Sequence, residues 1–199
     1  MYGLPPSTSL SRPLPKAAVY EKFGFKNAER EAFDRDISRM AIVEWVSPKT
    51  VPAIAAGTEV QDFYVVHIAL KRREYDPKQI ILLTKLIPQR MLFALEEGDA
   101  TQFAVFHTRL LKTEWCPTAE ATIKLNGLDF DKVWHNIVAF VGGLDASSAA
   151  SLEEQVLQRE ERQMLLRQIE QLERQCRAEK QTRRKYELYQ KLLTLKQLL

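Results

Sequence analysis

The feature that most constrains this chain is the distribution of the residues that interrupt helices. The sequence has 199 residues with seven Gly and nine Pro, and every one of these lies before residue 144. Because Gly and Pro most often end helices and form turns, a long stretch without either favours continuous helix. The chain therefore divides into a body with many turn signals and a C-terminal tail. The pair Gly142-Gly143 and the small polar residues after it predict the joint.

These breaks predict four segments along the chain. We expect an extended N-terminal arm at 1–16, an α+β domain at 17–144, a linker at 145–150 and a helical tail at 151–199. The charge divides at the same place. Residues before 151 balance 18 basic against 18 acidic residues, whereas the tail carries 11 basic and 8 acidic ones, so the tail holds the whole excess of +3.

Composition excludes several classes of protein. Hydrophobic residues make up 45% of the chain and charged residues 28%, which is too apolar for general disorder. No stretch approaches the roughly 18 to 20 uninterrupted apolar residues of a membrane span, and the first residues lack the apolar core of a secretory signal. Two cysteines, Cys116 and Cys176, are too few for a disulfide framework. We therefore expect a cytoplasmic protein with free thiols.

Hydrophobic periodicity predicts an α+β domain in the body of the chain. Helical spacing runs from Ala17 to about Met40 with an interruption at Gly24, Asp76-Pro77 is typical of a helix start, and a last helix is expected at 128–141. β-branched and aromatic runs bounded by turn residues predict strands at 41–46, 51–54, 59–71, 91–95, 102–108 and 110–115. We expect a mixed sheet of four or five strands with helices covering one face.

The tail is rich in Glu, Gln, Leu, Lys and Arg, which is typical of a long helix or a coiled coil. Two sets of apolar residues follow the 4-3-4 spacing of a coiled-coil seam, and they are Leu165, Ile169, Leu172 and Cys176, then Leu188, Leu192, Leu195 and Leu199. The two sets do not share a register, because continuing the first in steps of three and four residues misses the second. Either one helix of about 74 Å contains a register shift, or the tail bends near 178–185 and folds back as an antiparallel hairpin.

The seam breaks where the tail is most basic. Residues 177–185 contain one acidic residue and five basic ones, which are Arg177, Lys180, Arg183, Arg184 and Lys185. Such a block is interpreted either as a solvated helix face or loop, or as a contact with nucleic acid or with an acidic protein.

Within Glu59–Leu95 a predicted strand, VQDFYVVHIAL, precedes a helix that ends at Ile87-Pro88 and a strand MLFAL. This segment resembles the centre of a bacterial family, the domain of unknown function 4391. Similar segments include LPKAAVYEKF at 14–23, Thr113-Glu114-Trp115, the helix after Asn126-Gly127-Leu128, and AEKQTRRKYELYQKLLTLKQLL at 178–199. The resemblance implies an accessory member of bacterial gene clusters that contain helicases, a DNA methyltransferase and type III restriction-like subunits. An antiphage or DNA-restriction role follows from this association alone.

No catalytic motif stands out. A restriction-type nuclease needs an Asp and a nearby Glu-x-Lys to place a divalent metal. Asp62 lies on the strongest predicted strand and is followed by His67 and Lys71, but no Glu-x-Lys follows; Glu44 and Glu59 are the carboxylates that could join it in space. The histidines, at 67, 107 and 135, are interpreted as structural, although His67 and His107 could meet across a sheet. The cysteine at 116 is interpreted as an inert thiol. No cofactor or metal is expected.

We therefore expect a non-enzymatic adaptor that assembles through its helical tail. An amphipathic helix buries its leucine face only against a partner segment of the same chain or of another. The expected partner is a helicase, a methyltransferase or a second copy in a homodimer. One alternative is a nucleic-acid-binding accessory protein that uses the basic block at 177–185, and another is a cryptic metal-dependent nuclease.

Overall fold

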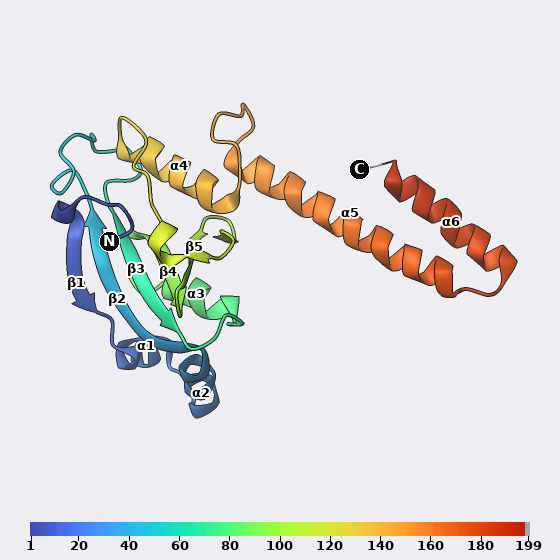
Figure 1. Cartoon of the computed structure of the whole chain (residues 1–199), viewed down its shortest axis with the longest axis horizontal. Coiled ribbons are helices and arrows are strands. Elements are labelled where there is room, and N and C mark those ends of the chain that lie inside the picture. The colour runs from blue at the N-terminus through green and yellow to red at the C-terminus, as the bar shows by residue number, and fades with distance from the viewer. Residues whose placement is uncertain (198–199) are drawn as a thin grey trace. The chain divides into compact units, whose positions relative to one another are not determined.

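A computed structural model describes residues 1–197 of the chain, and of Thr182 the backbone alone. The contacts within it define two compact units, Met1–Ser147 and Ser148–Leu199 (Figure 1). The division falls inside the stretch predicted as a linker, 145–150. None of the helices within these residues is long and apolar enough to cross a membrane.

The first unit is built on a mixed sheet. Its strands are β1 (Ser9–Pro13), β2 (Ile37–Val46), β3 (Phe63–Leu70), β4 (Arg90–Glu97), β5 (Ala100–Phe106), β6 (Leu110–Lys112) and β7 (Cys116–Pro117). The order is β1-β2-β3-β4-β5-β6, and β7 also pairs with β5. The pair β3–β4 is parallel and all the other pairs are antiparallel. The predicted α+β class with a mixed sheet is thus confirmed, but the sheet has more strands than the four or five expected.

The additional strands have local reasons. β1 lies in the proline-rich arm and pairs only with β2, so Pro13 sits on an edge strand, where a missing backbone N–H is tolerated. Within its first residues the arm also forms a short 3₁₀ helix, Pro6–Thr8. The segment 51–54, predicted as a strand, instead lies in the turn after β2.

Four helices belong to this unit, and they are α1 (Lys16–Phe23), α2 (Asn27–Asp36), α3 (Pro77–Leu83) and α4 (Phe130–Gly142). Gly24 ends α1 in the left-handed conformation with φ 62°, which accounts for the predicted interruption. Asp76 caps α3 as expected, because its carboxylate accepts the backbone N–H of Lys78 at 3.0 Å. The helix predicted to reach Met40 ends at Asp36, since the following residues begin β2 and bury Ile37 in the core.

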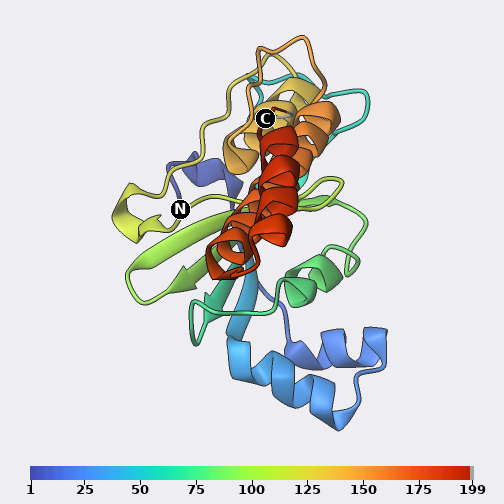
Figure 2. The ribbon, with the colours of Figure 1, turned by 90° about the vertical axis from the view of Figure 1, so that its right-hand side faces the viewer.

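Helices cover both faces of the sheet rather than one. Successive side chains of a strand point to opposite faces, and Val66 of β3 joins a buried cluster that includes Phe33 of α2 and Ile80 of α3. On the other face Phe63 of β3 packs against Phe130 and Trp134 of α4, with ring centroids 6.3 and 5.3 Å apart. Figures 1 and 2 show α4 toward one end of the sheet, with α1 and α2 toward the other.

The second unit is a helical hairpin. It consists of α5 (Leu152–Ala178) and α6 (Thr182–Lys196), which contact each other and are drawn in orange and red in Figure 1. Ser151 caps α5 through a reciprocal pair of bonds with Glu154. Of the two alternatives for the tail, the structure therefore shows the bend and the folding back.

Candidate functional site

The seam of the helical hairpin is formed by the two apolar runs of the tail. Ile169, Cys176 and Leu192 are buried, and Leu165, Leu172, Leu188 and Leu195 are half-buried. The last predicted member, Leu199, lies outside the described residues. Because the chain reverses between the runs, their registers do not need to match, and this explains the slip in the sequence.

The reversal is made without Gly or Pro by a side-chain cap. Glu179 leaves the helical conformation with ψ 127°, and its carboxylate accepts the backbone N–H of Gln181 at 2.9 Å. This bond is the main reason that the pKa of Glu179 is lowered. The stop signal is therefore an acidic side chain bonded to the backbone just after it, which is a much weaker sequence signal than Gly.

An ion pair joins the two helices. Lys196 of α6 lies 2.7 Å from Glu173 of α5, joining the end of one helix to the other. This ammonium group lowers the pKa of Glu173. Such exposed pairs stabilise a protein only slightly, so the apolar seam supplies most of the energy that holds α6 against α5.

The five basic residues of the block 177–185 lie at and beside the turn of the hairpin. Arg177 contacts Glu173 at 3.5 Å, and Arg183 and Arg184 contact Glu187 and Glu179 at 3.6 Å each. Lys180 and Lys185 are exposed as well. The structure thus places these side chains on one end of the hairpin, with several carboxylates among them.

The hairpin also exposes apolar side chains that sequence reasoning missed. Tyr186, Tyr189 and Leu193 of α6 are 63%, 50% and 39% exposed, and we call them the α6 stripe. Three further exposed residues lie on α5, and they are Leu157, Met164 and Leu166. The spacing of three and then four residues in the α6 stripe is the signal that could have found it, but the leucine seam beside it is stronger.

Of the three carboxylates proposed for a nuclease, Asp62 and Glu59 line one pocket and Glu44 lies apart from them. Asp62 accepts the indole N–H of Trp45 at 2.9 Å, and it lines an open pocket of about 270 Å³ with Glu59 and Arg90 at the start of β3 and β4. Glu44 is fully buried elsewhere in the sheet, where it accepts the hydroxyl of Thr8 at 2.8 Å and lies 2.8 Å from the amino group of Met1.

The remaining polar candidates have structural contacts. His67 is buried, and its Nε2 lies 3.1 Å from the carboxylate of Glu96. His135 lies 3.4 Å from the carbonyl of Ala146, and the thiol of Cys116 lies 3.5 Å from the carbonyl of Thr101. Lys71 is exposed. Over residues 1–197, no group of three or more His, Cys, Asp or Glu side chains is placed to hold a metal ion.

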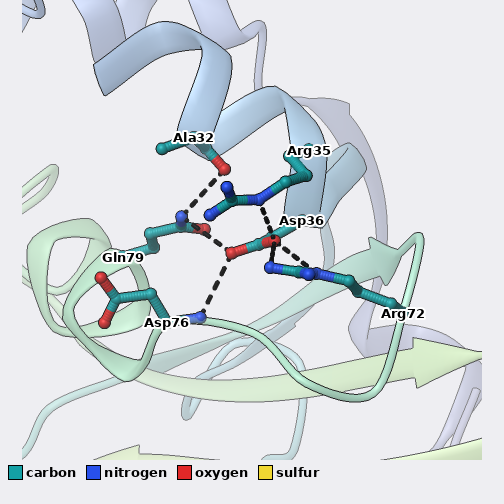
Figure 3. A network of polar contacts seen from close by, with 6 residues as sticks. All are labelled: Ala32, Arg35, Asp36, Arg72, Asp76 and Gln79. Atoms are coloured by element: carbon teal, nitrogen blue, oxygen red, sulfur yellow. Dashed lines mark hydrogen bonds and ion pairs between the residues drawn. The ribbon is translucent and has the colours of Figure 1, made fainter. Parts of the chain in front are cut away.

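A buried aspartate organises one network of polar contacts in the first unit (Figure 3). Asp36 is fully buried and accepts Nε of Arg72 at 2.7 Å, the side-chain amide of Gln79 at 3.1 Å and the backbone N–H of Asp76 at 3.3 Å. The same carboxylate lies 3.5 Å from Arg35. The network ties the end of α2 to the loop after β3 and to α3, and these donors engage the carboxylate of Asp36.

A second carboxylate fixes the loop that lines the Asp62 pocket. Asp131 of α4 accepts the backbone N–H groups of Thr58, Glu59 and Val60 at 2.6, 3.0 and 2.7 Å. These bonds, those from Val60 and Thr58 first, lower the pKa of Asp131. A methyl group at Gly57 would lie 2.3 Å from this carboxylate, so the approach requires glycine.

Replacing Asp131 by alanine is expected to release this loop. At pH 7 the backbone amides of 58–60 should exchange their hydrogens faster, because their shared acceptor is gone. Because the pKa of Asp131 is lowered in the folded chain, its contribution to stability is fully present above the pKa that it has in the unfolded chain. This contribution is lost as the pH falls through the pKa of the folded chain. Exchange measured by mass spectrometry or NMR tests this, with Glu59→Ala as the control that keeps every backbone donor. Equal exchange in the two variants would contradict the assignment.

A family model described as a domain of unknown function, DUF4391, matches residues 2–199. The chain belongs to the DUF4391 family. The resemblance noted in the sequence is thereby confirmed over both units of this DUF4391 protein. No curated protein and no solved structure matches it.

Proposed function

We propose that this DUF4391 protein is a non-enzymatic accessory protein that binds protein partners through its helical hairpin. The observation that carries the proposal is the distribution of exposed apolar side chains. Of the nine large hydrophobic side chains exposed among residues 1–197, six lie on α5 and α6. Exposed apolar side chains gathered on one element favour an interface, whereas single ones scattered over a surface do not.

The proposed setting is a bacterial DNA-restriction or antiphage gene cluster. Its support is the resemblance described above, which implies helicases and a methyltransferase as neighbours. In this setting the sheet and its helices supply a rigid body, and the hairpin supplies the surface that a helicase or methyltransferase subunit binds. Assembly with a second copy is the other form of the same proposal.

Ion pairs at the turn favour a protein over nucleic acid as the partner. Arg177, Arg183 and Arg184 each lie within 3.6 Å of a glutamate of the hairpin. These pairs engage three of the five basic side chains, which lowers the positive charge available to a phosphate backbone. A protein surface can instead accommodate both signs of charge and bury the apolar side chains beside them.

The proposal predicts that a partner complex depends on the folded hairpin. The full chain is captured from its native host, the co-purifying protein is identified, and binding of that purified protein is measured by calorimetry. Leu192→Asp, which breaks the seam, should abolish binding. Leu128→Ser is the matched control, because Leu128 is the most exposed large apolar residue of the first unit.

Three results decide this test. Loss of binding in the seam variant alone supports the adaptor function. Binding that survives Leu192→Asp, or that Leu128→Ser abolishes, contradicts a role for the hairpin. Light scattering of the purified chain distinguishes self-assembly from binding of a different protein. If the chain is a dimer and Leu192→Asp dissociates it, the partner is a second copy.

A further inference from the structure

α6 has two apolar faces, and only one of them is used within the hairpin. Leu192 faces the seam and is buried, whereas the residues of the α6 stripe are exposed. At about 100° per residue, the centre of the stripe lies roughly 125° around the helix from the seam. Spacing of three and four residues is the pattern by which one helix contacts another. The geometry therefore leaves a row of three apolar side chains exposed on α6.

The charges of α6 limit what can cover this face. The helix carries five basic residues and one acidic residue, a net charge of +4. On a helical projection Lys185 and Lys196 flank one side of the α6 stripe and Arg183 flanks the other. Lys196 and Arg183 also pair with Glu173 and Glu187, but the helix keeps its net positive charge. This charge favours a covering segment that is apolar along one line and acidic along its edges.

We propose that the α6 stripe binds an acidic amphipathic helix of a partner protein, which adds a third helix to the hairpin. This inference rests on the proposed function and specifies its surface and the chemistry of the partner. A second copy fits less well, because packing α6 on α6 would bring +4 against +4. Single-stranded nucleic acid also fits less well, since Leu193 extends the stripe with a side chain on which no base can stack.

A pair of synthetic peptides tests the charge requirement. The first is a three-heptad peptide with Leu at positions a and d and Glu at e and g, and its twin has Lys in place of Glu. Binding of each labelled peptide to the full chain is measured by fluorescence anisotropy at low and high salt. We expect the Glu peptide to bind about tenfold or more tightly than the Lys peptide at low salt, with the difference shrinking as salt rises.

Two double variants test the surface. Tyr186→Ser/Tyr189→Ser should weaken binding of the Glu peptide by about tenfold or more, because tyrosines at the centre of an interface carry much of its energy. The matched control, Leu157→Ser/Met164→Ser, removes two exposed apolar side chains of α5, and binding should be unchanged. Tyr189→Phe should retain binding, since it keeps the ring.

Several results would overturn the inference. These are equal binding of the two peptides, unchanged binding by the tyrosine variant, and a dimer in light scattering that the tyrosine variant dissociates. Binding of a single-stranded oligonucleotide that needs both tyrosines, without binding of the Glu peptide, would assign the stripe to nucleic acid instead. If the native complex survives Tyr186→Ser/Tyr189→Ser but is lost in Leu192→Asp, the adaptor function holds and the stripe is not its surface.

Discussion

Asp36→Ala is expected to lower the free energy of unfolding by about 3 kcal/mol. Asp36 is fully buried and holds Arg72, Gln79 and the backbone of Asp76 in one network (Figure 3). Without the carboxylate, the buried amide donors lose their acceptor and the guanidinium loses its counter-charge. Because Arg72 is partly exposed and can turn toward water, the loss stays below that of a fully buried ion pair.

Asp34→Ala is the matched control for this prediction. Asp34 lies two residues earlier in α2 and pairs with Lys16 and Tyr20 at 2.5 and 2.8 Å, but it is half exposed. Its removal should cost about 1 kcal/mol or less. Urea unfolding followed by circular dichroism measures both variants. A loss at Asp36 no larger than the loss at Asp34 would show that the network does not organise the unit.

The same network predicts a pH dependence. Burial raises the pKa of Asp36, but the backbone N–H of Asp76 and the guanidinium of Arg72 oppose this more strongly, and the net result is a lowered pKa. A lowered folded pKa gives stability that is present above the unfolded value, about 3.9, and that disappears as pH falls through the folded one. As the pH is lowered toward acid, the free energy of unfolding should therefore fall less steeply in Asp36→Ala than in the natural chain.

Local chemistry decided which parts of the fold could be predicted. β3 was found because both of its faces are apolar, and α3 because Asp76-Pro77 is a strong start signal. β1 was missed because its stability comes from pairing with β2, about 30 residues away in the chain. The Asp36 network was missed for a similar reason. Its members lie far apart in the chain and are brought together only by the packing of α2 on the loop after β3.

The candidate site shows the same limit. The seam was visible because leucines at fixed spacing are a local pattern, whereas the reversal at Glu179 depends on a side chain that bonds to the backbone beyond it. Tyr186 illustrates the consequence. Continuing the first seam through an unbroken helix would bury Tyr186, but the reversal places it on the exposed α6 stripe. The interaction surface could therefore be recognised only after the hairpin was known.

Leu192→Asp is expected to release α6 from α5. Leu192 is 6% exposed in the seam, and burying a carboxylate in its place removes apolar contact and adds a desolvation cost, together about 3 kcal/mol. Isolated helices of about 15 residues or fewer are marginal in water, and α6 has 15. Amide hydrogens of 183–196 should then exchange roughly a hundredfold faster, while those of β3 and β4 keep their protection.

Leu193→Asp provides the control at the neighbouring residue. Leu193 lies on the exposed α6 stripe, 39% accessible, so the same substitution should leave the exchange of α6 nearly unchanged. It should nevertheless abolish binding of the acidic peptide, because a carboxylate in the stripe repels one in the partner. Fast exchange in both variants would mean that α6 is not held by the seam. Leu192 holds α6 in place and Leu193 belongs to the binding surface. Comparing the two variants therefore separates a defect in binding from a loss of the folded helix.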